Sequence, residues 1–387
     1  MKRAIISSIA AVVTALAALL DANIVPGEPS LSQPAAAAPQ IPPLGLKWYI
    51  EDLHVGEPGG SLVLDEGGIA HISYSEITED LRYSPLQYAN RVSGQWNHEL
   101  VADMKWFGGP NHLKLKSNNR PFIAYVDCNL ISCEGSTANK AANIWNIQSE
   151  LAINISGSSL SLDLDSNDRP HLSFCTQFTP DFSITPALRH MYWSGTEWIT
   201  ETIDPGCWYS TSIRLDSQDH PRISYYLSES GDLKYATWTG SEWSNKTIDS
   251  AEDVGLWNDL ALDSYGFPHI AYLDSTTNSL KYTKWNGQDW ETQIVDQIPN
   301  ARAPLSLAVD SQGRAHIAYA KFSEIWYAFW SGQHWSIWKV DSGEQPSLAL
   351  NSNDLPQILY WSDNLKYARG EVLPLDKPVY FPFVQIK

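Results

Sequence analysis

The stretch LDSYGFPHIAYLDSTTNSLKYTKWNGQDW, from Leu262 to Trp290, decides the fold because the chain repeats it. Residues 309–335 read VDSQGRAHIAYAKFSEIWYAFWSGQHW, and residues 215–243 read LDSQDHPRISYYLSESGDLKYATWTGSEW. Seven copies align on the Asp of the DSxG turn or on its substitute, at Asp65, Lys116, Asp165, Asp216, Asp263, Asp310 and Asn351. The intervals between these anchors are 51, 49, 51, 47, 47 and 41 residues, a period typical of β-propeller blades.

One copy shows why each repeat should form a four-stranded sheet. Ser306–Val309 is a short apolar strand, and Asp310–Gly313 is a tight turn in which Asp bonds its own backbone and Gly accepts a positive φ. Ala315–Tyr319, Ile325–Trp330 and His334–Val340 supply three more strands. Apolar residues occupy both faces of these strands, as a blade between two neighbours requires.

The ends of the chain predict how the ring closes. After Leu365–Glu371 the last copy lacks a good fourth strand, whereas Lys47–Leu53 resembles the fourth strand of other copies. We therefore predict an all-β, seven-bladed β-propeller of four-stranded antiparallel blades over residues 47–371, closed by an N-terminal strand, which removes exposed sheet edges. The alternative fourth strand, Pro378–Lys387, contains two prolines and is a poor strand.

The first residues read as a targeting segment. Ala4–Leu20 is an apolar run behind two basic residues, and cleavage after Ala37 would follow small residues. We predict a signal peptide (1–37), a linker (38–46) and a Pro/aromatic tail (372–387), with a retained signal anchor as the alternative. The mature chain would be secreted or associated with the cell envelope, without a transmembrane span.

Composition limits the partners of the chain. Its 44 acidic and 26 basic residues give a formal charge of −18, which argues against nucleic acid and against an anionic membrane surface. The charge fits neutral or cationic ligands.

Four cysteines in an exported chain suggest disulfides. We predict Cys128–Cys133 and Cys175–Cys207. Their spacing is not that of a zinc site, and no motif demands a metal or another cofactor; Ca²⁺ near Asp163 and Asp259 is an option that no motif supports.

The copies, read as DSxGxPHIxY…LKYAxWxGxxW, resemble the BNR-type repeats of exported bacterial propellers of the sialidase-like and fucose-lectin-like groups. The resemblance covers residues 47–370. It implies the architecture and leaves glycosidases, polysaccharide lyases, lectins and plain scaffolds open. The sialidase Asp-box S-x-D-x-G-x-x-W matches no copy, and the arginine triad of true sialidases cannot be placed.

The first strand of each copy departs from the repeat in a few blades. Four and two residues before the anchor, the default is Ser with a small apolar partner. His112, Lys114, Asp163, Arg214 and Asp259 break this default on successive blades near the axis. They form either a polar binding pocket or a structural set of ion pairs in which Lys114, Asp163 and Arg214 neutralise one another.

Aromatic residues mark the loops expected to lead into the same blades: Trp106–Phe107, Trp208–Tyr209 and Trp257. Loop aromatics contact ligands, or they fill gaps between blades. The tryptophans that recur in register from Trp193 to Trp335 indicate packing instead. Asp127–Lys140 and Cys175–Ala187 read as the longest loops between second and third strands, which is where binding residues are expected.

The predicted ligand-binding residues are thus His112, Lys114, Asp163, Trp208, Tyr209, Arg214, Trp257 and Asp259, with no catalytic residue assigned. The favoured function is non-catalytic recognition of an extracellular glycan or protein by a monomer. One alternative is an extracellular glycosidase or lyase, the lyase using His112, Tyr209 and Arg214, since elimination needs a base and a group that neutralises a uronate. The other alternative is a structural envelope module.

Overall fold

The computed structural model describes residues 45–76, 84–104, 107–128, 132–153, 155–177, 184–299 and 304–372. Every helix or strand assigned in these ranges is a β-strand, 28 in all. Among these residues, none forms a helix long and apolar enough to cross a membrane. Residues 1–44 and 373–387, which hold the predicted signal peptide, most of the predicted linker and the tail, lie outside the described ranges.

The first three blades are each formed by four consecutive strands. Blade 1 comprises β2 (Ser61–Leu64), β3 (Ala70–Ser75), β4 (Leu86–Val92) and β5 (Gln95–Ala102). Blade 2 comprises β6 (Phe107–Leu115), β7 (Pro121–Cys128), β8 (Cys133–Ala141) and β9 (Ile144–Ile153). Blade 3 comprises β10 (Ile155–Leu164), β11 (Pro170–Thr176), β12 (Ala187–Trp193) and β13 (Trp198–Pro205).

Blades 4 to 6 continue this order, and blade 7 borrows a strand from the N-terminal end. Blade 4 comprises β14 (Cys207–Leu215), β15 (Pro221–Leu227), β16 (Asp232–Trp238) and β17 (Trp243–Asp249). Blade 5 comprises β18 (Val254–Leu262), β19 (Pro268–Asp274), β20 (Ser279–Trp285) and β21 (Trp290–Gln297). Blade 6 comprises β22 (Leu305–Val309), β23 (Ala315–Lys321), β24 (Glu324–Trp330) and β25 (Trp335–Ser342). Blade 7 comprises β26 (Glu344–Leu350), β27 (Pro356–Trp361), β28 (Leu365–Val372) and β1 (Leu46–Asp52).

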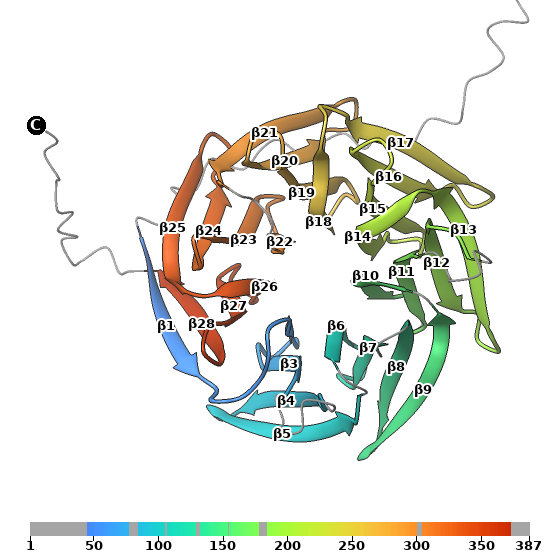
Figure 1. Cartoon of the computed structure of the whole chain (residues 1–387). Helices are drawn as coiled ribbons and strands as arrows, with labels where there is room; N and C mark the ends of the chain where they lie inside the picture. Colours follow the sequence, from blue (N-terminus) through green and yellow to red (C-terminus); the bar gives the residue numbers. More distant parts are fainter. Residues whose placement is uncertain are drawn as a thin grey trace, which may run out of the picture. The chain divides into compact units, whose positions relative to one another are not determined.

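The seven sheets are arranged in a ring with the first strand of each blade nearest the axis and the fourth at the periphery (Figure 1). All neighbouring strands within a sheet are antiparallel. This confirms the predicted fold class.

The seventh sheet joins the two ends of the ring. Its order is β1-β28-β27-β26, and β1 pairs with β28 from Leu46↔Val372 to Asp52↔Lys366. The N-terminal strand therefore occupies the outermost position of blade 7. The rival segment, residues 378–387, lies outside the described residues.

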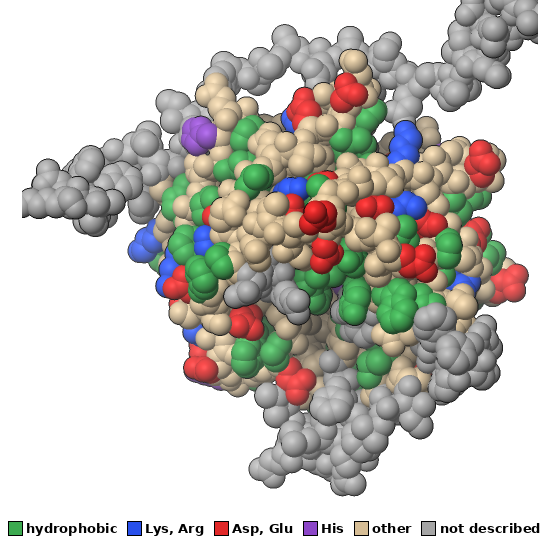
Figure 2. Space-filling model, turned by 45° about the horizontal axis from the view of Figure 1, so that its top comes forward, with side chains coloured by type: hydrophobic (Ala, Val, Ile, Leu, Met, Phe, Trp, Pro, Cys, Tyr) green, Lys and Arg blue, Asp and Glu red, His purple; other side chains and the backbone are tan. Residues whose placement is uncertain are grey.

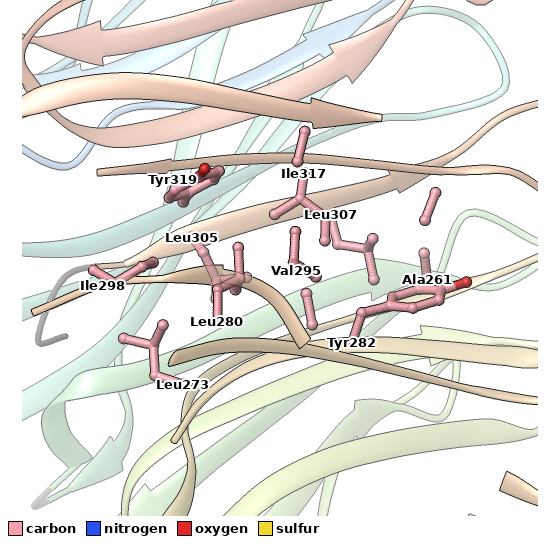
Figure 3. Packing of buried hydrophobic residues seen from close by; sticks show 13 residues of the cluster. Ala261, Leu273, Leu280, Tyr282, Val295, Ile298, Leu305, Leu307, Ile317 and Tyr319 are labelled. Atoms are coloured by element: carbon pink, nitrogen blue, oxygen red, sulfur yellow. The ribbon is translucent and has the colours of Figure 1, made fainter. Parts of the chain in front are cut away.

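Each blade is held by apolar side chains on both faces of its second strand. Every residue of β3, β11 and β19 is buried. The side chains of one blade pack against those of the next: Leu273 and Leu280 of blade 5 share a cluster with Leu305 and Ile317 of blade 6 (Figure 3). The repeated apolar pattern therefore builds one core per blade interface, as burial between two neighbours requires.

The turn after each first strand explains the DSxG pattern. In blade 6 the carboxylate of Asp310 accepts hydrogen bonds from the N–H groups of Gln312 and Arg314, and Gly313 has φ 73°. The residue three positions after the anchor has a positive φ in all seven blades, and it is Gly, Asn or Asp in each: Gly68, Asn119, Asp168, Asp219, Gly266, Gly313 and Asp354. These are the residue types that tolerate the left-handed region.

A polar cluster, called here the outer clamp, recurs between blades. In blade 6 the Tyr319 hydroxyl donates to Asp296 of blade 5 at 2.8 Å, and the Lys321 Nζ lies 2.9 Å from the same carboxylate. The same aspartate–tyrosine pair joins blades 3 and 4, 4 and 5, and 6 and 7, where the lysine comes from the third strand instead of the second: Asp204–Tyr225–Lys234, Asp249–Tyr272–Lys281 and Asp341–Tyr360–Lys366.

Both predicted disulfides are present. Cys128–Cys133 closes the hairpin between β7 and β8, and Cys175–Cys207 joins the end of β11 to the start of β14. The second bridge therefore links blade 3 to blade 4, and both of its cysteines are buried.

The expected loop lengths need correction. Most of Asp127–Lys140 lies in β7 and β8, so it is a tight hairpin rather than a long insertion. The wide gaps between second and third strands fall between Ser75 and Leu86 in blade 1 and between Thr176 and Ala187 in blade 3. The first of these gaps was not predicted from the sequence.

Candidate functional site

The axis of the ring contains a cavity of about 650 Å³. It is lined by the first strands of all seven blades, β2, β6, β10, β14, β18, β22 and β26. The volume lies within the range of small-ligand sites.

A ring of side-chain oxygens joins the first strands across the blade interfaces. Six residues four positions before the anchor accept a hydrogen bond from a backbone N–H of the next first strand, at 2.9–3.1 Å: Ser61, Ser161, Ser212, Asp259, Ser306 and Ser347. On β6 this position carries His112. Sequence analysis noted the repeated serine but missed its role, although its recurrence at a fixed offset was the signal for a structural bond.

His112 is therefore a departure from a structural position, and it lines the cavity. Burial lowers the pKa of His112 to about 4; Asp259 opposes this effect, and Arg214 and Lys114 reinforce it. The imidazole is neutral at neutral pH, so one ring nitrogen is free of a proton and can accept one.

Lys114 and Asp163 form the first of two ion pairs at the axis. The Lys114 Nζ lies 2.8 Å from the Asp163 carboxylate, which also accepts a 2.9 Å hydrogen bond from the Leu215 N–H. Burial opposes ionisation of Asp163, but Lys114, Arg214 and this hydrogen bond outweigh it and lower its pKa. Asp163 is thus held as a carboxylate.

Arg214 and Asp259 form the second pair. The Arg214 Nη2 donates to Asp259 at 3.1 Å, and its Nη1 donates to the Ile213 carbonyl at 2.7 Å. Asp259 accepts further hydrogen bonds from the Ser212 hydroxyl and from the N–H groups of Leu260 and Leu307. The aspartate therefore replaces the structural serine of its blade and also anchors the arginine.

These contacts bear on the two alternatives raised for the charged residues. Ion pairs do form: Lys114 contacts Asp163 and Arg214 contacts Asp259, while the charge of Arg214 also acts on Asp163. His112, Lys114, Arg214 and Asp259 also line the cavity. Lys114 and Arg214 are thus paired with aspartates and also reach the cavity. An anionic group of a ligand can therefore compete with these aspartates for the two cations.

The aromatic residues predicted to bind a ligand do not all reach the cavity. Trp257 lines the cavity, whereas neither Trp208 nor Tyr209 is among its lining residues, and Tyr209 is 48% exposed. Trp208, Tyr209 and Trp257 lie in the first strands β14 and β18 rather than in loops, because both strands begin with irregular pairing before the regular register. Trp106 lies outside the described residues.

A further departure from the repeat lies away from the cavity. Three blades pair a second-strand histidine with a third-strand tyrosine, for example His316 Nδ1 with Tyr327 Oη at 2.6 Å. In blade 3 His190 replaces the tyrosine; it lies 3.0 Å from His171 and 3.3 Å from Glu201. Burial lowers the pKa of both histidines, that of His171 to about 4.

Other candidate chemistry finds less support. Three acids lie at or next to the ends of second strands, where a glycosidase could place its carboxylates: Glu76, Asp127 and Asp274. None of them lines the axial cavity, and Asp274 is buried against Lys281 at 2.7 Å. Among the described residues, no group of three or more His, Cys, Asp or Glu side chains is arranged to hold a metal ion. On the face shown in Figure 2, acidic side chains are interspersed with Lys, Arg and apolar groups instead of forming one block.

No known family model matches the chain, and no curated protein matches it either. Solved structures share its fold. A polysaccharide lyase of family PL25, an ulvan lyase, is 14% identical, with 81% of this chain and 93% of that chain covered and a TM-score of 0.54. Polysaccharide lyase Uly1 is 10% identical over 82% of this chain and 90% of its own, with a TM-score of 0.52. AofleA from Arthrobotrys oligospora is 11% identical over 77% and 91%, with a TM-score of 0.51.

These similarities correct one expectation. Sequence analysis leaned toward a non-catalytic protein, because no catalytic motif was recognisable. Polysaccharide lyases share the ring, one of them in a structure described as bound to -[GlcA(1-4)Rha3S]-. The preference for a non-enzyme is therefore corrected: enzymes share this fold, so the fold gives no reason to favour a non-catalytic protein.

Proposed function

We propose that this protein is an extracellular polysaccharide lyase that cleaves a uronate-containing polymer in its axial cavity. The observation that carries the proposal is a neutral histidine, His112, in a cavity that also contains the cations Lys114 and Arg214. Two disulfides are consistent with an oxidising, extracellular setting.

Elimination from a uronate needs a cation beside the carboxylate, because the negative charge on that group grows as the neighbouring C–H bond breaks. Lys114 and Arg214 are the two cations that line the cavity. Arg214 presents a planar fork that can bind a carboxylate through two hydrogen bonds. Its present partner, Asp259, holds it in place for this task.

The base would be His112. Its ring nitrogen takes the C5 proton, the C5–H electron pair forms the C4=C5 double bond, and the C4–O bond breaks with its electrons on the glycosidic oxygen. That oxygen takes the proton of the histidinium, directly or relayed through a water molecule, which restores neutral His112. No oxidant, reductant or further reactant is required.

Hydrolysis by paired carboxylates is less well supported. A glycosidase needs one carboxylic acid that stays protonated near neutral pH, with a raised pKa. The pKa of Asp163 is lowered instead, and the Asp259 carboxylate is engaged by Arg214 and by three further hydrogen-bond donors. Both acids of the axis therefore act as partners of cations.

The test is incubation of the mature chain with a panel of uronate polymers: a glucuronate–rhamnose-3-sulfate polymer, alginate, polygalacturonate and hyaluronan. Release of 4,5-unsaturated uronate ends is followed by ultraviolet absorbance. His112→Ser installs the serine that other blades carry at this position, so we expect a folded protein whose kcat falls about 10²–10⁴-fold. His334→Ser changes an exposed histidine outside the cavity and is the matched control.

The pH profile gives a second readout. Because the pKa of His112 is about 4, kcat/KM of the wild type should fall as pH drops through about 4 and the imidazole is protonated. The proposal fails if no polymer yields unsaturated ends, or if His112→Ser keeps full activity.

A further inference from the structure

One aromatic side chain in the cavity has a backbone conformation that does not suit it. Trp257 has φ 51° within β18. The left-handed region is uncommon for non-glycine residues and unfavourable for bulky ones. Two other described residues six positions before their anchors also have a positive φ, Gln345 in blade 7 (53°) and Gly59 in blade 1 (101°). A positive φ at this position is therefore shared by three blades, but tryptophan is not a residue type that it favours.

The conformation of Trp257 is fixed by its neighbours. The buried amide of Asn258 accepts a hydrogen bond from the Ser224 hydroxyl at 2.6 Å and donates to the Gly255 carbonyl at 2.9 Å and the Ser210 hydroxyl at 3.1 Å. Gly255 has φ 101°, and a Cβ there would lie 2.7 Å from the backbone of Leu233. These contacts hold the backbone on both sides of Trp257 and thereby define where its indole starts from the strand.

Trp257 lines the same cavity as charged residues of the axis. Trp257 is half-buried: it packs against the apolar cluster between blades 5 and 6 and also lines the axial cavity. Asp259, two residues later on β18, holds Arg214. An indole and a guanidinium are therefore presented to one cavity from neighbouring blades.

We propose that Trp257 is a stacking platform that binds the sugar unit next to the uronate held by Arg214, and so sets the specificity of the cavity. An indole offers a large apolar face with a polar edge, which suits the C–H face of a sugar ring. The substrate class is then a polymer in which each uronate adjoins a sugar with an open apolar face, such as a deoxy sugar. A strained backbone held rigidly by a network is expected at a binding site. This inference rests on the proposed function.

The experiment separates binding from folding. Trp257→Asn removes the ring and supplies a residue that tolerates a positive φ, whereas Trp257→Phe keeps a ring. Trp285→Asn, in the Trp285–Trp290 pair outside the cavity, is the control. Each variant is measured for kcat, KM and thermal midpoint on the best polymer of the panel. Binding of oligosaccharides from every panel polymer is measured by calorimetry in the His112→Ser background.

For Trp257→Asn we expect KM to rise at least tenfold with kcat nearly unchanged, binding to weaken by the same factor, and the thermal midpoint to change little. Trp257→Phe should retain most of the affinity, and Trp285→Asn all of it. Unchanged KM and binding in Trp257→Asn, with or without a lower thermal midpoint, would mean that the indole only packs, and would overturn the inference. Tight binding that depends on Trp257 but without elimination by the wild type would refute the lyase and support the platform. No binding of any probe by the His112→Ser background overturns the platform.

Discussion

The outer clamps and the axial ring are both polar contacts between blades, yet they differ in regularity. At four interfaces the clamp is the same aspartate, tyrosine and lysine. At the axis the repeated serine gives way to His112 and Asp259, and two further charged residues, Lys114 and Arg214, line the same cavity. The packing of blades explains why the clamp is repeated at the periphery. It does not explain why residues that line the cavity differ from the repeated serine.

Among the single substitutions, the largest loss of stability should follow from removing Asp259. Asp259→Ala leaves Arg214 unpaired and the Leu307 N–H without its acceptor, so we expect the free energy of unfolding to fall by about 3 kcal/mol. Asp259→Ser restores the oxygen used in other blades and should cost less. Urea denaturation of both variants measures the difference; equal losses would mean that the axial ring of oxygens contributes nothing.

Removal of the disulfide between blades 3 and 4 tests whether the outer clamp alone is enough to stabilise that interface. Cys175 and Cys207 are 32 residues apart, and Cys128 and Cys133 only 5. Loop entropy predicts losses of about 4 and about 2 kcal/mol when each pair is replaced by alanine. Denaturation of the two double variants gives the comparison, and a larger loss for the short loop would contradict this reasoning.

A single outer clamp should contribute less than the axial aspartate. Asp296→Ala leaves the hydroxyl of buried Tyr319 and the amine of Lys321 without their partner, so we expect a loss of about 1–3 kcal/mol. Asp103→Ala, at an exposed position after β5, is the control and should lie within about 0.5 kcal/mol of the wild type. Equal effects in the two variants would show that the clamp is not stabilising.

The His171–His190 pair, a departure from the repeat that does not line the axial cavity, should affect the pH dependence of stability. Both folded-state pKa values are lowered, so the unfolded chain binds more protons between about pH 4 and pH 6.5 and stability falls as pH falls through this window. Each such histidine contributes a slope of up to about 1.4 kcal/mol per pH unit. His190→Tyr restores the usual pair, so unfolding measured across this window should show a shallower slope; an unchanged slope would contradict this account.

The sequence predicts the ring well because its anchors are local: an Asp, a turn and a left-handed residue recur at fixed offsets. It also predicts both disulfides. The partners of Arg214 could not be predicted, since Asp259 lies on the next blade and its distance depends on how blades pack. Trp208 and Tyr209 were expected beside Trp257, but the irregular starts of β14 and β18 give only Trp257 a place in the cavity lining.

The most direct test of the axial site is a crystal structure of the His112→Ser protein with an oligosaccharide from the polymer that the wild type cleaves. We predict a uronate carboxylate on Arg214 or Lys114, its C5 facing residue 112, and the adjoining sugar against Trp257. An oligosaccharide bound at the periphery of the blades, with an empty axis, would contradict the account.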